Sequence, residues 1–311
     1  MEVVDVAVVG GGPAGSICAA LCASAGLRVA LIEREKFPRE KVCGDCVNPA
    51  CWQVLEQIGI AQEVWDLPSA ALRGVEFIAI GGQKLRLDFA LNEHGMIAIK
   101  RSHFDNLLLN RARELGAQIH EEATVVSLHK TRDCDWKIDI VRETLLTRIL
   151  VGADGRNSTV AHLSNLLPAP ERERIALQAH IPLPRDFGNR IVLQFLPEGY
   201  SGQAPVNNRE LNLCLVGLPS TISSLRAWAE RQFNLPANQT WRTITPLTRA
   251  PITARRENLF MIGDAARVVE PFTGEGIYYA LQSGELAANA IVKIVRGEDR
   301  QSILREYVRA H

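Results

Sequence analysis

The first 33 residues constrain the fold more than any other part of this 311-residue chain. Val3 to Val9 is a near-continuous β-branched run, which is typical of a strand buried on both faces of a parallel sheet. It leads into Gly10-Gly11-Gly12-Pro13-Ala14-Gly15, and apolar and small residues then recur at helical spacing as far as Ala25. A second strand, Arg28 to Ile32, ends in Glu33. This order predicts a βαβ unit and therefore an α/β fold.

The turn of this unit carries the residues of a dinucleotide site. Gly10 permits the tight turn, Gly12 lets a pyrophosphate approach the backbone, and Gly15 lets the helix pack closely on the strand. Glu33 can accept hydrogen bonds from an adenosine ribose, and its charge favours a free 2′-hydroxyl, as in FAD or NAD, over NADP. The unit does not choose between FAD and NAD. Three neighbours complete this part of the candidate set: Pro13, Ala14 and Arg34.

A second strand-to-helix stretch, near the end of the sequence, has the pattern of a flavin site. Four apolar residues predict a buried strand, Gly263 lets the backbone leave the sheet, and Asp264 projects a carboxylate that can bind sugar-alcohol hydroxyls. Pro271, Gly274 and Gly276 lead into a long helix, whose first N–H groups can face an electron-rich ring such as reduced flavin. The alternative is an ordinary strand, loop and helix with a solvated aspartate.

A third segment repeats this pattern in the middle of the chain. The apolar strand from Leu145 to Val151 is followed by Asp154 and Gly155, and a helix is expected to start near Ser158. Alone, this segment is equally compatible with an ordinary turn. Its place between the βαβ unit and the Gly263-Asp264 stretch favours one nucleotide site assembled from separated parts of the chain.

A polar connection after Glu33 carries Cys43 and Cys46 in a CxxC spacing. Such a pair can be a redox couple or half of a metal site. Since no second CxxC or paired histidine cluster completes a metal site, we expect no metal and favour a loop that carries free thiols near the cofactor. A helix is predicted to follow, from Ala50 to about Val64.

Strand patterns elsewhere indicate a second, mostly antiparallel unit. Its expected elements are a hairpin within residues 75–89, strands at 191–195 and 211–216, and an amphipathic helix at 221–233. We expect this unit to face the substrate.

The composition excludes several classes of protein. A hydrophobic content of 47% argues against disorder, and a formal net charge of zero gives no electrostatic reason to expect nucleic acid as a partner. No apolar run approaches the roughly 20 residues that cross a bilayer, and the first residues lack the features of a signal peptide. We therefore expect a cytoplasmic protein, with peripheral membrane contact left open. The seven cysteines, an odd number, indicate reduced thiols.

Together, the three segments resemble the FAD-dependent oxidoreductases of the aromatic-hydroxylase group over nearly the whole chain. Within this group, the stretch from Pro271 to Ala280 and the sequence Lys41-Val42-Cys43-Gly44 are more similar to the geranylgeranyl reductase family. The hydroxylases typically carry histidine where this chain has Arg267, and glutamine where it has Glu275.

The resemblance implies FAD on a discontinuous, doubly wound, Rossmann-like domain with an interleaved, mostly antiparallel β-sheet substrate domain. We expect the FAD-binding domain to comprise residues 1–72, 100–165 and 251–311. The substrate domain would comprise residues 73–99 and 166–250.

The resemblance also implies roles for the candidate residues. Asp154 and Gly155 would lie beside the pyrophosphate, Asp264 would bind the ribityl chain, and Gly274 and Gly276 would face the isoalloxazine. The complete cofactor-binding set is Gly10, Gly12, Pro13, Ala14, Gly15, Glu33, Arg34, Cys43, Gly44, Arg101, Val125, Asp154, Gly155, Gly263, Asp264, Pro271, Gly274, Glu275, Gly276 and Ile277.

The implied activity is reduction of C=C bonds in a hydrophobic, isoprenoid-like substrate by hydride transfer from reduced flavin. Cys43, Asp45 or a water would supply the accompanying proton, so Cys43 and Asp45 are the candidate catalytic residues. Because the chain has one dinucleotide fingerprint, NAD(P)H would bind only transiently as electron donor, or another reductant would serve. One segment, residues 199–207, departs from the reductases, since only Tyr200 and Pro205 fit their aromatic-rich pattern. Two alternatives stay open: an FAD-dependent monooxygenase, and a flavin-binding electron carrier that turns over nothing itself.

Overall fold

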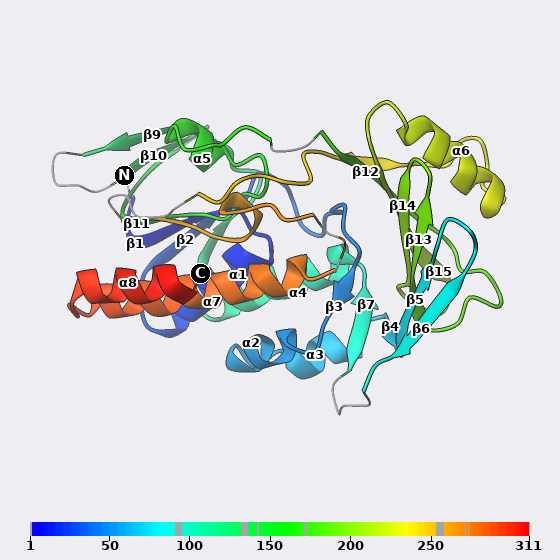
Figure 1. Ribbon diagram of the computed structural model, residues 1–311. Coiled ribbons are helices and arrows are strands. Elements are labelled where there is room, and N and C mark those ends of the chain that lie inside the picture. Colours follow the sequence, from blue (N-terminus) through cyan, green and yellow to red (C-terminus); the bar gives the residue numbers. More distant parts are fainter. Residues whose placement is uncertain are drawn as a thin grey trace.

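The computed structural model describes residues 2–90, 95–131, 136–141, 143–170, 173–252, 258–270, 272 and 274–310. Figure 1 shows a helix-covered sheet, with α7 and α8 along one side, next to an upright second sheet that carries α6. Two seven-stranded sheets and one small sheet make up the β-structure of the described residues. The predicted α/β fold class, with a helix-covered sheet built around the βαβ unit and a mostly antiparallel second sheet, is confirmed.

The first sheet is built around the predicted βαβ unit. Its strand order is β8-β2-β1-β11-β10-β9, and β17 also pairs with β11. The strands are β1 (Glu2–Val9), β2 (Val29–Ile32), β8 (Gln118–His120), β9 (Val125–Lys130), β10 (Trp136–Ile140), β11 (Glu143–Gly152) and β17 (Leu259–Met261). β1 runs parallel to β2 and β11, and β11 runs parallel to β17. The carboxyl ends of β1, β11 and β17 are therefore neighbours, which brings together the three segments that follow them.

Helices cover this sheet and pack against one another through small residues. They are α1 (Pro13–Ser24), α4 (Arg101–Glu114), α5 (Thr159–Leu163), α7 (Gly276–Val295) and α8 (Arg300–Ala310), with a short 3-10 turn at Gly263–Ala265. α7 approaches α1 closely at Gly284, where a Cβ would lie 2.4 Å from the carbonyl oxygen of Ala14. Only glycine permits this approach, so α7 packs directly on the helix that follows the glycine-rich turn. In the part of the chain that the structure describes, no helix is both long and apolar enough to cross a bilayer.

The second sheet has the order β16-β12-β15-β14-β13-β5-β6. Its strands are β5 (Gly74–Ile78), β6 (Lys84–Asp88), β12 (Ile175–Pro182), β13 (Arg190–Leu196), β14 (Gly199–Pro205), β15 (Glu210–Gly217) and β16 (Arg242–Ile244). All pairs are antiparallel except β5 with β13. The helix α6 (Ile222–Gln232) buries leucines of β12 and β15 on one face. Since side chains alternate along a strand, the other face is directed toward the first sheet.

A small sheet lies between the two halves. It comprises β3 (Cys46–Val47), β7 (Met96–Ile99) and β4 (Ser69–Leu72). One prediction about the helices that follow β3 was wrong. The single helix predicted from Ala50 to Val64 is two helices, α2 (Cys51–Gln57) and α3 (Ala61–Asp66). Gly59 adopts a left-handed φ of 69° between them, which ends the first helix. The expected domain boundaries stay a prediction.

Candidate functional site

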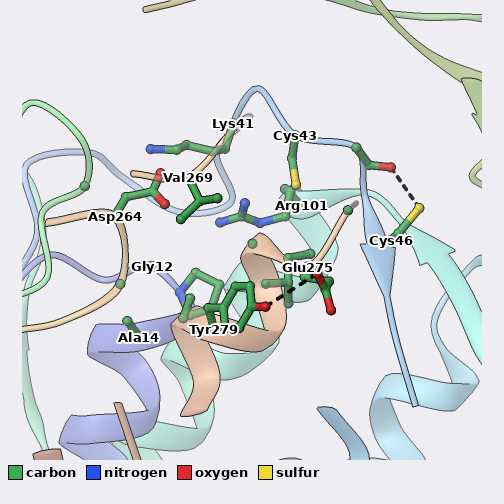
Figure 2. Close-up of a pocket in the computed structure, with 18 of the residues that line it drawn as sticks. Gly12, Ala14, Lys41, Cys43, Cys46, Arg101, Asp264, Val269, Glu275 and Tyr279 are labelled. Atoms are coloured by element: carbon green, nitrogen blue, oxygen red, sulfur yellow. Dashed lines mark hydrogen bonds between the residues drawn. The ribbon is translucent and has the colours of Figure 1, made fainter. Parts of the chain in front are cut away.

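A cavity of about 1790 Å³ lies between the two large sheets. Single small-molecule sites usually measure about 300–1,000 Å³, so this space is large enough for an extended cofactor and a second molecule. Residues of the glycine-rich turn, the loop after β2, the loops after β11 and β17, and the inner face of the second sheet line it. Figure 2 shows Gly12 and Ala14 at one side of this space, with Cys43 and Arg101 further along it.

The three predicted segments meet at this cavity, and their glycines are required there. A Cβ on Gly15 would lie 1.9 Å from the carbonyl oxygen of Gly10, and a Cβ on Gly10 would lie 2.4 Å from that of Ala153. A Cβ on Gly263 would lie 3.0 Å from Cβ of Ala14. The turn after β1 is therefore packed directly against the segments after β11 and β17.

The start of α1 offers an anion site of the kind that a pyrophosphate needs. Gly12 is its N-cap, Pro13 occupies the first turn, and no side chain caps the free N–H groups. Glu33, at the end of β2, is buried and accepts hydrogen bonds from the N–H groups of Gly11 and Glu35, at 2.7 and 2.9 Å. Its carboxylate lines the cavity next to the turn, as expected for a ribose ligand, and Arg34 lies on the rim.

Several basic residues line the cavity, and four of them interact with Asp105 or Asp264; only one of these four, Arg101, was predicted. Arg101 is buried and forms a bidentate ion pair with Asp105, with N–O distances of 2.6 and 2.8 Å. Arg39 lies 3.2 Å from the same carboxylate. The other two are Lys41 and Arg156. The signal for Arg39 and Lys41 is visible in the sequence as basic residues that follow Glu33, the predicted ribose ligand.

Lys41 and Arg156 both interact with Asp264. Arg156 pairs with the Asp264 carboxylate at 2.9 Å, and Lys41 interacts with it electrostatically. Burial lowers the pKa of Lys41 to about 8, because the ammonium lies in a poorly hydrated place near other cations. Figure 2 shows its side chain directed toward Asp264. An anionic group bound beside Lys41 would raise this pKa again and hold the ammonium charged to higher pH.

Asp154 and Gly155 line the cavity, but the Asp154 carboxylate is turned toward its own chain. It accepts hydrogen bonds from Ser158 Oγ at 2.5 Å and from the N–H of Val160 at 3.1 Å, at the start of α5. Burial raises its pKa. Asp154 thus shapes the loop, and Gly155, with a φ of 83°, presents its backbone to the space near Lys41.

The loop before α7 meets the CxxC loop. Gly274 has a φ of 73°, and a Cβ there would lie 3.9 Å from Cβ of Cys46. Gly276 is the first residue of α7, Glu275 is its N-cap without a side-chain cap, and both line the cavity with Ile277. Free N–H groups and the helix dipole therefore point into the cavity. Two further predicted residues, Gly44 and Val125, also line it, whereas Pro271 lies outside the described residues.

Cys43 lies where these walls meet. Figure 2 shows its sulfur directed toward Arg101. Burial raises the pKa of the Cys43 thiol, while the Arg101 guanidinium and the N–H of Asp45 act in the opposite direction. Cys43 and Cys46 are free thiols, and Cys46 Sγ donates to the carbonyl of Gly44 at 3.3 Å. Cys43 is thus a protonated thiol. If it lost its proton, the Arg101 guanidinium and the N–H of Asp45 would stabilise the thiolate.

Asp45 is buried and does not line the cavity. It has a left-handed φ of 61°, and its Oδ2 lies 2.7 Å from His180 Nε2 on β12. Asn212 Nδ2, on β15, donates to the same oxygen at 2.8 Å and to the carbonyl of Cys43 at 2.7 Å. Cys214 Sγ donates to that carbonyl at 3.4 Å. No local sequence pattern predicts these partners, which come from strands more than 130 residues away.

One end of the cavity is aromatic. Tyr200 packs edge-on against Phe272, with ring centroids 5.4 Å apart, and Phe195 lies 5.8 Å from the same ring. The hydroxyl of Tyr200 is buried, and burial raises its pKa. Together with Val216 and Leu247, these rings form a small apolar cluster beside Cys214.

The residues present fit FAD. Four features match an adenosine diphosphate with its pyrophosphate. They are a turn whose close packing requires glycine, an uncapped helix start, a buried carboxylate after β2, and nearby cations. A second uncapped helix start suits the electron-rich end of a flavin. Fold and site thus define an FAD-type nucleotide-binding protein with a separate, mostly antiparallel second sheet.

Comparison with known proteins gives the family. The FAD binding domain family matches residues 3–181 and 225–310, and the chain belongs to it. The menaquinone reductase of Mycobacterium tuberculosis is 30% identical, over 92% of this chain and 76% of its own length. A digeranylgeranylglycerophospholipid reductase of Methanopyrus kandleri is 26% identical, over 97% and 84%. Conditioned medium factor receptor 1 of Dictyostelium discoideum is 28% identical over 98% of this chain, and the chain spans 66% of that protein's length.

Solved structures show the same fold. The flavin-dependent halogenase CmlS superimposes with a TM-score of 0.86 at 22% identity, over 99% of this chain and 62% of the halogenase. The sequence-based prediction of an FAD-binding oxidoreductase fold is confirmed. The resemblance to the geranylgeranyl reductases is matched only by distant relatives.

Proposed function

We propose that this protein is an FAD-dependent reductase of C=C bonds in a hydrophobic, isoprenoid-like substrate. The observation that carries the proposal is the position of Cys43, a buried thiol that lines the same cavity as the uncapped start of α7 and the inner face of the second sheet. The relatives named as reductases of menaquinone and of a digeranylgeranyl lipid support it.

FAD would be held by the turn after β1, by Glu33 and by the cations Arg39, Lys41 and Arg101, and when reduced it supplies a hydride. The residues of the chain have to hold the substrate, keep water out and deliver one proton. The hydride and the proton together add one hydrogen to each carbon of the double bond. NAD(P)H, bound transiently, is the electron donor that we propose.

Cys43 is the proton donor in this proposal. Burial keeps the thiol protonated until its proton is transferred to the substrate carbon. The Arg101 guanidinium and the N–H of Asp45 then stabilise the thiolate, so the proton leaves into a site that already accommodates the charge. Asp45 lies outside the cavity lining, so we assign it a positioning role.

The second sheet supplies an apolar wall opposite this thiol. Ile191, Leu193, Val75 and Phe77 line the cavity on one side, and Tyr200 with Phe272 close it on another. An apolar wall excludes water from the reaction and binds a substrate that has few polar groups. Transfer of such a substrate from a bilayer would need peripheral membrane contact, which we propose as well.

The test is anaerobic. Purified protein loaded with FAD is reduced, and then menaquinone or a geranylgeranyl compound is added. We expect flavin reoxidation without oxygen and a product whose isoprenoid chain has gained two hydrogens; fragmentation in the mass spectrometer must place them on the chain, because reduction of a quinone ring to the quinol also adds two. Cys43→Ala should slow reoxidation by on the order of a hundredfold, while Cys51→Ser, a buried thiol outside the cavity, should not.

Two results would favour the alternatives. A reduced protein that is reoxidised only by oxygen, with substrate-dependent formation of a hydroxylated product, would identify a monooxygenase. A protein that binds FAD but shows no substrate-dependent reoxidation with any lipid or quinone would be an electron carrier.

A further inference from the structure

The edge strand β6 exposes two leucines. Leu85 and Leu87 have 57% and 50% of their surface exposed, although they belong to a regular strand. Their register partners on β5 are Phe77 and Val75. Directly opposite residues of an antiparallel pair project from the same face, so these four side chains form one apolar surface, here called the edge strip.

The opposite face of the same two strands is charged. Glu76 on β5 pairs with Arg86 on β6 and lies 3.3 Å from Lys84. Charged side chains on an edge strand discourage pairing with a strand of another molecule. The edge strip is therefore poorly suited to a second copy of this chain.

The edge strip continues into the cavity. On β13, Ile191 is the register partner of Val75, and Leu193 is that of Phe77. These four residues line the cavity, whereas Leu85 and Leu87 lie just outside it. Since neighbouring strands are about 4.8 Å apart, the apolar face extends about 10 Å from β13 to β6.

Toward β12, the inner face is polar beside Asp45 and is otherwise occupied by the buried cluster around Tyr200. Gln178 and His180 on β12 and Asn212 on β15 bond to one another or to Asp45. A substrate cannot leave in that direction without breaking this buried network. The only end of the inner face that is both apolar and open, among the described residues, is the edge strip.

We infer that the edge strip is the outer part of the substrate site, over which the apolar chain of a substrate longer than the cavity extends. This inference rests on the proposed function. The occupant is a hydrocarbon chain of several isoprene units, with its reacting double bond near Cys43 and its far end on Leu85 and Leu87. Contact with the chain would remove the exposed leucine surface from water.

The test uses apolar alcohols of increasing chain length, from two to four isoprene units, and the FAD-loaded protein. Binding is followed by the change in flavin fluorescence. For the unmodified protein we expect affinity to rise with chain length. In Leu85→Asp with Leu87→Asp, affinity for the longest alcohol should fall about tenfold. The exposed surfaces of the two half-buried leucines together amount to about one leucine side chain. Affinity for the shortest alcohol should stay the same.

Two controls keep the result interpretable. Leu218→Asp replaces a leucine of similar exposure, 49%, outside the cavity lining, and should leave all affinities unchanged. Leu85→Asn with Leu87→Asn removes the apolar surface without adding charge and should reproduce the effect. FAD content and circular dichroism verify that each variant is folded.

Three outcomes would overturn the inference. Equal losses for short and long alcohols would place the leucines inside the reacting site. Unchanged affinities would separate the edge strip from the substrate. Loss of binding to phosphatidylglycerol vesicles, with intact dependence on chain length, would make it a membrane contact. If the unmodified protein bound FAD but no alcohol of any length, the proposed function would fail as well.

Discussion

Nε2 of His180 lies 2.7 Å from Oδ2 of Asp45, in a contact that joins the second sheet to the loop carrying Cys43. Both side chains are nearly buried, with 9% and 1% of their surface exposed. Asn212 reinforces the contact, because its amide donates both to Asp45 and to the carbonyl of Cys43. Oδ1 of Asp45 has no hydrogen-bond partner among the described residues. The ionised form of Asp45 therefore depends on His180 and Asn212.

We predict that His180→Ala changes how stability depends on pH. Burial raises the pKa of Asp45, so between about pH 4 and the raised pKa the folded state binds more protons than the unfolded chain. The contribution of Asp45 to stability is thus present in acid and falls as pH rises through that window. Loss of the His180 hydrogen bond raises the pKa further, so the fall extends to higher pH and its total is larger.

Urea unfolding from pH 4 to pH 8 measures this effect. The His180→Ala variant should lose on the order of 1–3 kcal/mol more stability than the unmodified protein at the upper end. Asp45→Asn, which cannot ionise, should remove the pH-dependent part in the same range. Identical pH profiles for the unmodified protein and His180→Ala would contradict the prediction.

A second prediction concerns Lys41 and the affinity for FAD. The pKa of Lys41 is lowered to about 8, so its ammonium is charged at neutral pH and loses its proton as the pH rises above 8. A charged ammonium attracts the pyrophosphate, and Lys41→Met should therefore weaken FAD binding about tenfold at pH 7. Because bound pyrophosphate stabilises the ammonium, affinity of the unmodified protein should fall only as the pH rises above 8.

Titration of FAD by fluorescence between pH 6.5 and 9.5 tests this role. Lys41→Arg keeps its charge throughout, so its affinity should be nearly independent of pH, and Lys41→Met should be flat at a weaker value. If Lys41→Met retained the pH dependence of the unmodified protein, another group would be responsible.

A third prediction separates two glycines of α7. At Gly284 a Cβ would lie 2.4 Å from the backbone of Ala14, so Gly284→Ala should push α7 away from α1 and cost about 1–3 kcal/mol. At Gly276 nothing lies within 4 Å of the added Cβ, so Gly276→Ala should leave the FAD-free protein equally stable. It should still weaken FAD binding, since the added methyl group enters the cavity.

Thermal unfolding without FAD and FAD titration distinguish the two effects. The expected pattern is reduced stability for Gly284→Ala, and reduced affinity with normal stability for Gly276→Ala. If Gly276→Ala bound FAD as tightly as the unmodified protein, the start of α7 would not contact the cofactor.

A fourth prediction concerns the reactivity of the Cys43 thiol. Its pKa is raised by burial, so alkylation of the FAD-free protein should be slow at pH 7 and accelerate with rising pH. Bound FAD should slow it further by covering the cavity. Mass spectrometry of the modified peptide measures the rate. Alkylation that is fast at pH 7 and insensitive to FAD would place the thiol outside the cofactor site.

Local patterns in the sequence sufficed for the parts of the site that depend on the backbone. The turn from Gly10 to Gly15, Glu33 at the end of β2, and the glycines before α7 all lie where their spacing predicted. Glycine requirements and hydrophobic periodicity are set by neighbours within a few residues, so the sequence records them. The break between α2 and α3 at Gly59 is not predicted by the sequence pattern, because a single glycine is often tolerated inside a helix.

Only the tertiary structure decided which side chains meet. His180, Asn212 and Cys214 reach the CxxC loop because two strands of the second sheet place them there, and no local pattern in the sequence marks that contact. The turn of the Asp154 carboxylate toward α5 and the burial of Asp45 have the same origin. Hydrogen-bond partners and burial depend on residues that are distant along the chain, and folding alone brings those residues together.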